Sequence, residues 1–246
     1  MNGNTTRRVA VIFNPVKGEP EEMKQQVIDA ARRHGWEDPE FRETSVEDPG
    51  FAPAQQAAEE GYDMIFAAGG DGTVRAVAAA LRGTGSTLAI IPVGTGNLLA
   101  RNLKLPLDVP EAIETAFSGQ DTRIDVCTAL LTLPDGESEE LDFVVMAGVG
   151  IDAQMIVNTD DDLKKKIGFL AYGVAIAKSL TGGRRLHLTW KLEDAPVRRT
   201  RVHSLIVGNC GDLVASVPLL PDAVANDGHF DLVALRPRGL PGWGLI

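Results

Sequence analysis

The chain has few cysteines and no long apolar run, and both absences narrow what it can be. Cys127 and Cys210 are its only cysteines, which excludes a disulfide framework and a clustered metal-thiolate site. No apolar stretch reaches the roughly 18 residues that a membrane-spanning helix needs. The N-terminus leads into an ordinary strand without a signal-peptide core, so we expect a cytoplasmic protein.

Basic residues are outnumbered by acidic ones. The chain has 24 Lys and Arg against 34 Asp and Glu, for a net charge of −10. This balance argues against a nucleic-acid partner and against constitutive adhesion to anionic lipid. Local basic clusters are interpreted as solvated faces, with a membrane-facing role as the alternative. They are Lys164–Lys166, Arg184-Arg185, and Arg198-Arg199 with Arg201.

The first half of the chain alternates short apolar runs with helical stretches. From Val9 to about Asp125 this pattern predicts successive βα units and hence a parallel sheet. Strands are expected at Val9–Phe13, around Phe41–Thr44, at Met64–Ala68 and at Leu88–Ile91. Helices are expected at about Glu21–His34, Pro53–Glu60, Val74–Leu81 and Leu98–Asn102.

The pattern changes after Asp125. Apolar runs at Val126–Leu133 and Leu141–Ala147 flank Pro134-Asp135-Gly136-Glu137, and Asp-Gly between such runs indicates a hairpin. A helical stretch is expected from about Asp161 to Ser179. Further strands are expected at Leu186–Leu192, Arg201–Val207 and Phe230–Leu235. We therefore predict an α/β domain over residues 1–125 and a mainly antiparallel β domain over residues 126–246.

A glycine-rich turn directly follows a buried strand. The run Met64–Ala68 leads into Gly69-Gly70-Asp71-Gly72-Thr73, and a helical stretch follows. Adjacent glycines let the backbone approach an anion, and the N–H groups at the start of the next helix favour phosphate. Asp71 would repel phosphate unless a cation or a reacting hydroxyl intervenes. The turn alone is weak evidence, since many such turns only join a strand to a helix.

Two further turns have the same setting. Pro92-Val93-Gly94-Thr95-Gly96-Asn97 follows the strand Leu88–Ile91, and Asn14-Pro15-Val16-Lys17-Gly18 follows the strand Val9–Phe13. Ligands of open α/β sheets bind outside the carboxyl ends of the strands. The three turns together predict one ligand site at that edge of the sheet.

These three motifs, in this order, resemble the diacylglycerol kinase catalytic-domain family, which groups bacterial lipid kinases with sphingosine and ceramide kinases. The resemblance continues in Phe143–Asp152, Pro221-Asp222-Ala223 and Asp227–Asp231, and so covers nearly the whole chain. NAD kinases and phosphofructokinases share the Gly69–Thr73 motif, whereas the turn from Pro92 to Asn97 favours lipid kinases.

The resemblance implies a fold, two cofactors and a set of site residues. The fold is a nucleotide domain like that of NAD kinases and phosphofructokinases, followed by a β-sandwich-like domain that binds lipid. The reaction is transfer of the γ-phosphate of ATP, with Mg²⁺, to a hydroxyl of diacylglycerol or a related lipid at a membrane surface. Asp71 either holds Mg²⁺ through water or orients the acceptor hydroxyl, and it is the one catalytic residue expected within the chain. Nucleotide contacts are expected from Asn14, Thr44, Gly69, Gly70, Asp71, Gly72, Thr73, Val74, Arg75, Gly94, Thr95 and Asn97.

A second ion is expected in a late turn. By resemblance, a structural divalent ion is bound by the carboxylate of Asp227 and the main-chain carbonyls of Val224 and His229, oxygen ligands that suit Mg²⁺ or Ca²⁺. The alternative is a plain Asp-Gly turn without an ion. The oligomeric state is open, with a homodimer as one option.

The chain departs from the family's pattern in three places. Arg75-Ala76 stand where many members have Asn-Glu, and Leu98 stands where many bacterial members have an acidic residue. The family's general base is an acidic residue in an Asp-Gly-Glu or Asp-Gly-Asp element near the C-terminus, and the chain ends at Ile246 before such an element. Asp135-Gly136-Glu137 has these letters but is interpreted as a hairpin turn. We therefore expect a truncated and impaired form of a longer kinase, since loss of a base costs about 10²–10⁴-fold in rate.

Two other functions stay open on the sequence. A soluble small-molecule kinase of the NAD kinase type would share the Gly69–Thr73 motif, although the Thr95-Gly96-Asn97 turn fits it poorly. A nucleotide-binding protein without catalysis would bind ATP and not turn it over.

Overall fold

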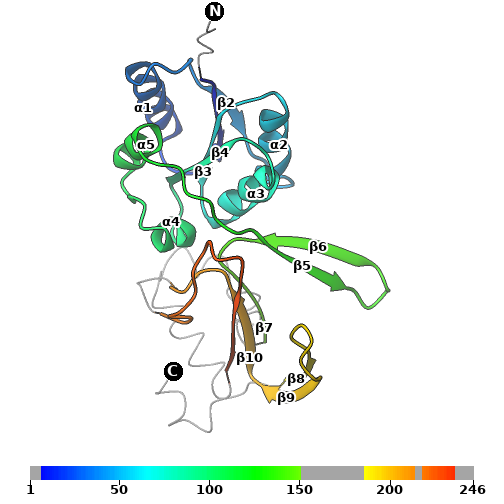
Figure 1. Ribbon diagram of the computed structural model, residues 1–246. Helices are drawn as coiled ribbons and strands as arrows, with labels where there is room; N and C mark the ends of the chain where they lie inside the picture. Colours follow the sequence, from blue (N-terminus) through cyan, green and yellow to red (C-terminus); the bar gives the residue numbers. More distant parts are fainter. Residues whose placement is uncertain (1–6, 151–185, 214–217, 236–246) are drawn as a thin grey trace, which may run out of the picture. The chain divides into compact units, whose positions relative to one another are not determined.

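The computed structural model describes residues 7–150, 186–213 and 218–235 (Figure 1). The chain divides into two compact units, and each is described by itself. The first unit comprises Met1–Val145 with Asn209–His229, and the second comprises Met146–Gly208 with Phe230–Ile246.

A four-stranded parallel sheet forms the centre of the first unit. Its strands are β1 (Val9–Phe13), β2 (Glu40–Glu43), β3 (Met64–Gly69) and β4 (Thr87–Pro92), in the spatial order β2-β1-β3-β4. All residues of β1 and β3 are buried, which explains their continuous apolar sequences. Because every strand runs the same way, all four carboxyl ends meet at one edge.

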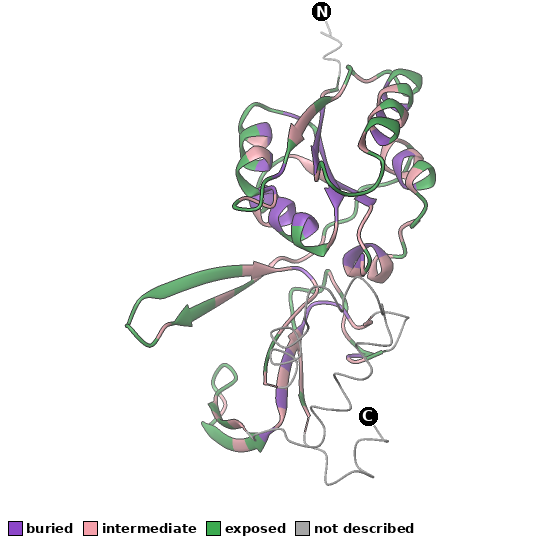
Figure 2. Ribbon diagram, turned by 180° about the vertical axis from the view of Figure 1, so that it is seen from behind, coloured by how far each residue is buried: buried purple, intermediate pink, exposed green. Residues whose placement is uncertain are grey.

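Helices cover both faces of this sheet (Figure 1). Helices α1 (Pro20–Arg33) and α5 (Val109–Ser118) pack on one face, against the side chains of Val9, Val11 and Phe13 in β1. The alternate side chains of β1 face the other side, where α2 (Phe51–Glu59) and α3 (Asp71–Leu81) pack. Figure 2 shows the resulting buried strands between half-buried helices.

The helix α5 is absent from the sequence-based prediction. Its signals are the acceptor Asp108, whose Oδ1 lies 3.1 Å from the Glu111 nitrogen, and a proline in the first turn. The other helices match within a few residues, including the short α4 (Leu98–Asn102), which has the predicted bounds.

An antiparallel hairpin of β5 (Cys127–Thr132) and β6 (Ser138–Phe143) belongs to the first unit. Its turn contains Gly136 at φ +89°, as the Asp-Gly signal predicts. Most of the hairpin is exposed (Figure 2). At its base the guanidinium of Arg82, the residue that follows α3, donates to the Thr128 hydroxyl at 2.7 Å, which fastens the hairpin to this helix.

The second unit consists of antiparallel strands. β7 (Met146–Gly150), β10 (Ser204–Gly208) and β11 (Asp231–Leu235) form a sheet in the order β11-β10-β7, and β8 (Leu186–Trp190) pairs with β9 (Arg198–Val202). The parallel sheet followed by antiparallel sheets confirms the predicted fold class. The helix expected at Asp161–Ser179 lies outside the described residues, as do Lys164–Lys166 and Arg184-Arg185.

Two predicted strands are wrong because each is two strands. The run Leu141–Ala147 contains the end of β6 and the start of β7, and the run Arg201–Val207 contains the end of β9 and the start of β10. In the second case the hydrogen-bonding partner changes at His203, whose nitrogen donates to the Leu235 carbonyl at 2.9 Å. An alternating apolar pattern continues through such a change of partner, so it does not reveal the break.

The boundary expected at residue 125 differs from the division into units. The β5–β6 hairpin groups with the parallel sheet, and so does the later segment from Asn209 to His229. That segment is fastened to the first unit by Asn209, whose side-chain nitrogen donates to the Asp125 carbonyl at 2.9 Å, and by the buried Cys210.

Candidate functional site: a phosphate cradle of three turns

The three glycine- or asparagine-bearing turns lie against one another at the carboxyl edge of the sheet. The Asn14 nitrogen, just after β1, donates to the Ala68 carbonyl of β3 at 3.2 Å. A Cβ on Gly18 would lie 3.5 Å from the Val93 side chain, which joins the first turn to the one after β4. The predicted convergence is therefore present.

The closest approach joins the turn after β3 to the turn after β4. A Cβ added to Gly94 would lie 2.5 Å from the Gly70 Cα and 2.8 Å from the Asn97 Oδ1 atom. Real side-chain contacts are not so short, and only glycine leaves room for the two main chains to touch. This contact explains the glycine at position 94 independently of any ligand.

Asp71 also joins these two turns. Its Oδ2 atom accepts a hydrogen bond from the Asn97 nitrogen at 3.1 Å, and its Oδ1 atom accepts one from the Leu98 nitrogen at 2.6 Å. These are the N-cap and first residue of α4, so the carboxylate binds the positive end of that helix. A Cβ on Gly96 would lie 2.5 Å from Oδ2, so this residue too must be small.

Asn97 holds its own turn together from inside. The side chain is buried, its Oδ1 atom accepts from the Gly94 nitrogen at 3.0 Å, and its Nδ2 atom donates to the carbonyls of Gly94 at 2.8 Å and Pro92 at 3.3 Å. Its φ of +50° lies in the left-handed region, which asparagine tolerates better than most residues. The side-chain amide thus stabilises the turn through hydrogen bonds within it, and its contact with nucleotide remains a prediction.

The start of α3 offers free donors at the same place. The Val74 nitrogen donates to the Gly70 carbonyl at 3.0 Å, which begins the helix, while the N–H groups of Asp71, Gly72 and Thr73 have no acceptor among the described residues. Such a set of N–H groups at the positive end of a helix binds anions. A Cβ on Gly72 would meet no atom within 4 Å, so no neighbouring group crowds this residue on its side-chain side.

The remaining predicted residues divide between this edge and its surroundings. Thr73 is buried against Gly69, and Thr44 is buried at the end of β2, where its nitrogen donates to the Phe13 carbonyl at 2.9 Å. Thr95 is exposed in its turn, and Val74 points into the core. Arg75 reaches away from the turns to the β5–β6 hairpin, where its Nη1 atom donates to the Asp142 carbonyl at 3.2 Å.

Lys17 is a candidate site residue that the sequence-based prediction misses. Its Nζ atom would lie 3.5 Å from a Cβ on Gly70, so the ammonium group stands beside the turn after β3. The side chain is exposed, and no carboxylate in the described ranges pairs with it. An unpaired cation beside free N–H groups adds a charge that phosphate can neutralise. The signal in the sequence is a lysine within the first turn.

The late turn that was expected to bind an ion lies elsewhere on the first unit. The Asp227 Oδ1 atom accepts from the His229 nitrogen at 2.9 Å within the turn, and the neighbouring Gly228 nitrogen donates to the Asp125 Oδ2 atom at 2.8 Å. Val224 and His229 are exposed. No group of three or more His, Cys, Asp or Glu gathers anywhere in the part of the chain that the structure covers. The ion at Val224, Asp227 and His229 remains a prediction.

Neither cysteine has the environment of a nucleophile. Cys210 is buried, and its thiol lies 3.5 Å from the Val144 carbonyl. Burial, with smaller contributions from Cys127 and Asp212, raises the pKa of the Cys210 thiol to about 11. Burial also raises the pKa of Cys127. Both thiols therefore stay protonated at neutral pH and are inert.

A parallel sheet with free helix N–H groups, close glycine turns and a cation at its carboxyl edge is typical of phosphate-binding α/β proteins. Among the described helices, none has the length and apolar character needed to span a membrane. Residues 8–129 match the model of the diacylglycerol kinase catalytic domain. This match confirms the resemblance to the diacylglycerol kinase catalytic-domain family seen in the sequence.

Relatives match well beyond this domain. A diacylglycerol kinase of Staphylococcus aureus is 27% identical over 245 residues, which are 98% of this chain and 74% of that protein. A diacylglycerol kinase of Staphylococcus saprophyticus is 28% identical over 98% of this chain and 76% of its own length. The crystal structure of a diacylglycerol kinase from Bacillus anthracis has the same fold, with a TM-score of 0.73 at 22% identity over 98% of this chain and 77% of that one.

Proposed function

We propose that the protein is a lipid kinase that transfers the γ-phosphate of ATP to a hydroxyl of diacylglycerol or a related lipid. The observation that carries the proposal is the convergence of three turns around free N–H groups at the start of α3. The names of the relatives favour diacylglycerol as the acceptor, since each is described as a diacylglycerol kinase.

The triphosphate is proposed to lie on the turn after β3. The N–H groups of Gly72 and Thr73 donate to phosphate oxygens, and the Lys17 ammonium neutralises part of their charge. Phosphoryl transfer depends mainly on such positioning and charge neutralisation. The residues therefore supply what the reaction needs from a protein on the nucleotide side.

The residues at this edge also fit Mg²⁺. A carboxylate has about four lone-pair positions, and the two hydrogen bonds to α4 leave Asp71 others for a hydrated ion. Asp71 would hold the ion, and a bound Mg²⁺ would supply positive charge to offset the charge that develops on the phosphate during transfer. The backbone of α4 keeps the Asp71 carboxylate oriented, and a fixed carboxylate loses little entropy on binding a cation.

The reaction exchanges one phosphorus–oxygen bond for another. The lipid hydroxyl oxygen forms a bond to the γ-phosphorus, the bond from that phosphorus to the bridging oxygen of ADP breaks, and the hydroxyl proton is lost to a base. The free N–H groups hold the phosphates in line for this exchange.

Labelled phosphate transfer tests the proposal. The protein is incubated with γ-labelled ATP and Mg²⁺ in mixed micelles that contain diacylglycerol, sphingosine or ceramide, with NAD in a parallel detergent-free reaction. We expect labelled lipid with diacylglycerol or a close relative, formed slowly because the expected general base is not among the residues identified in the sequence. Labelling of NAD alone would overturn the lipid assignment, and tight ATP binding without any transfer would favour a regulatory protein.

Lys17 gives a second test that does not depend on turnover. Lys17→Met should weaken the binding of ATP by about tenfold and leave the binding of adenosine unchanged, because only the phosphates meet the ammonium group. Lys104→Met is the matched control, since Lys104 is exposed and also pairs with no carboxylate of the described chain. Equal ATP affinity in the wild type and Lys17→Met would remove Lys17 from the site.

A further inference from the structure

The β8–β9 hairpin of the second unit has two chemically different faces. Cross-strand pairing places His187 opposite Arg201 and Thr189 opposite Arg199, so these four side chains share one face. All four are exposed. The other face carries the half-buried or buried apolar residues of both strands, namely Leu186, Leu188, Trp190 and Val202.

The polar face carries only positive or neutral groups. No carboxylate of the described ranges lies within 4.0 Å of the guanidinium groups of Arg199 or Arg201. The carboxylates of Glu193 and Asp194 lie in the loop between the strands, beyond the last cross-strand pair. This is a local excess of positive charge in a chain of net charge −10.

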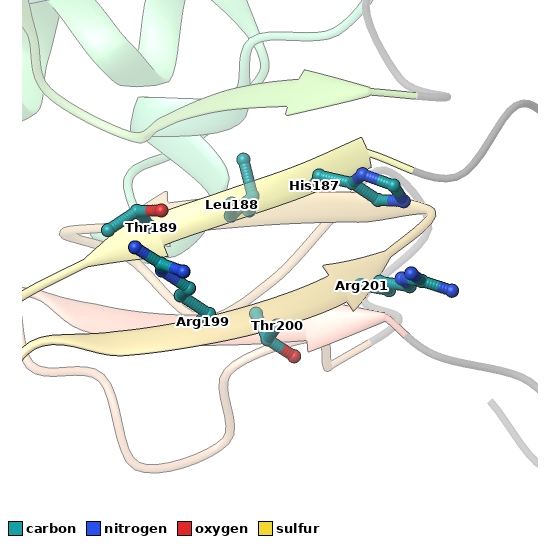
Figure 3. A pocket seen from close by; sticks show the side chains of 6 residues that line it. All are labelled: His187, Leu188, Thr189, Arg199, Thr200 and Arg201. Atoms are coloured by element: carbon teal, nitrogen blue, oxygen red, sulfur yellow. The ribbon is translucent and has the colours of Figure 1, made fainter.

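The side chains of this face border a pocket whose lining also includes Leu188 and Thr200 from the other face. His187, Leu188, Thr189, Arg199, Thr200 and Arg201 line this pocket on the hairpin. In Figure 3 the Arg199 guanidinium reaches across to Thr189, and His187 and Arg201 lie together at the other end. A guanidinium beside a hydroxyl is a good donor set for a phosphate group.

The end of the hairpin adds groups that suit a lipid–water boundary. Trp190 lies there with the Arg198 guanidinium 5.6 Å from its ring centre, and Leu192 and Val197 in the adjoining loop are 45% and 62% exposed. Tryptophan and arginine are favoured at the level of lipid headgroups. A soluble polyanion would not need these exposed apolar side chains.

We propose that the face of His187, Thr189, Arg199 and Arg201 docks on a lipid surface that carries anionic phosphate headgroups. The proposal deepens the proposed function and rests on it, since a kinase of diacylglycerol must reach its substrate in a lipid surface. It names the element of the second unit that makes the contact. Docking neutralises cations that otherwise repel one another on one strand.

Vesicle flotation tests this proposal without nucleotide or substrate. The full chain is mixed with vesicles of phosphatidylcholine alone, or with about one third phosphatidylglycerol, at low salt. We expect binding only to the anionic vesicles. Each basic residue near an anionic surface contributes about fivefold in affinity, so Arg199→Gln with Arg201→Gln should weaken binding on the order of 25-fold. Salt near 1 M should remove it, because charges are then screened within about 3 Å.

Three controls make the result specific. Arg199→Lys with Arg201→Lys keeps the charge and should retain most of the binding. Lys104→Gln with Arg123→Gln removes the same charge from exposed positions outside the hairpin and should bind like the wild type. Thermal melting of each variant checks that it is folded.

Several results would overturn the docking surface. One is wild-type protein that does not bind anionic vesicles, and another is a folded Arg199→Gln, Arg201→Gln variant that binds them as well as the wild type. Binding of duplex DNA that depends on the same two arginines would also count against a lipid surface. Phosphate transfer in uncharged detergent micelles separates this failure from failure of the proposed function. That transfer would persist if only the docking surface were misassigned, and it would be absent if the protein were not a lipid kinase.

Discussion

The contact between the turns after β3 and β4 predicts a large difference between two glycine-to-alanine variants. In Gly94→Ala the new methyl group would lie 2.5 Å from the Gly70 Cα, so the two main chains must separate by about 0.9 Å to reach an ordinary 3.4 Å contact. Overpacking of this kind costs about 1–3 kcal/mol. For a chain of this size that cost corresponds to a fall in Tm of roughly 2–12 °C.

The matched control is Gly72→Ala, two residues after Gly70. Its methyl group would meet nothing within 4 Å. Neither Gly72 nor Gly94 has a positive φ, so backbone strain does not differ between the two variants. Gly72 lies in the first turn of α3, where alanine favours the helix by up to about 1 kcal/mol. The Tm of Gly72→Ala should therefore equal or exceed that of the wild type.

Differential scanning fluorimetry and calorimetric titration with ATP provide the measurements. We expect Gly94→Ala to melt earlier and to bind ATP about tenfold more weakly, because displacement of Gly70 moves the N–H donors. If Gly94→Ala melts with the wild type and binds ATP equally well, the two turns do not touch as described and the reasoning fails.

Three further predictions concern single side chains. Asp71→Asn should lower the free energy of unfolding in urea by about 1–2 kcal/mol, because an amide nitrogen then faces a backbone N–H; unchanged stability would contradict the bonds to α4. Asn97→Ala should lower the free energy of unfolding by about 2–3 kcal/mol, and Asn97→Gly should lower it by about 1 kcal/mol less, since glycine accepts a φ of +50°. Equal losses of stability in the two variants would argue against the left-handed backbone. At pH 8 the Cys210 thiol, with its pKa raised to about 11, should be about 0.1% thiolate. It should react with Ellman's reagent only after the protein unfolds. Rapid reaction of two thiols in the native protein would refute the burial of Cys210.

The sequence predicts the framework of the site better than its contacts. Apolar runs that are followed by glycine-bearing turns identify β1, β3 and β4, and parallel strands bring these turns to one edge, so the location follows from local signals. The Asp71 bonds to α4 link residues 26 and 27 positions apart, and no local pattern encodes them. The place of Lys17 beside Gly70 depends in the same way on the packing of two strands.

The second unit is harder to predict for a different reason. Alternating sequences show which face of a strand is buried but not which strand pairs with it. The segment Arg201–Val207 therefore reads as one strand although its partner changes from β8 to β7 and β11.

The hydrogen bond from the Leu98 nitrogen to Asp71 makes one amide proton a reporter of the site's charge state. The proton is held by a carboxylate from another turn, at 2.6 Å, so its chemical shift and its exchange with solvent depend on how strongly that carboxylate accepts. A cation that draws electron density from Asp71 weakens this bond, and the Leu98 signal should respond before any helix moves. Nuclear magnetic resonance could thus follow metal and nucleotide arriving at the cradle through a single resonance, without a label on either ligand.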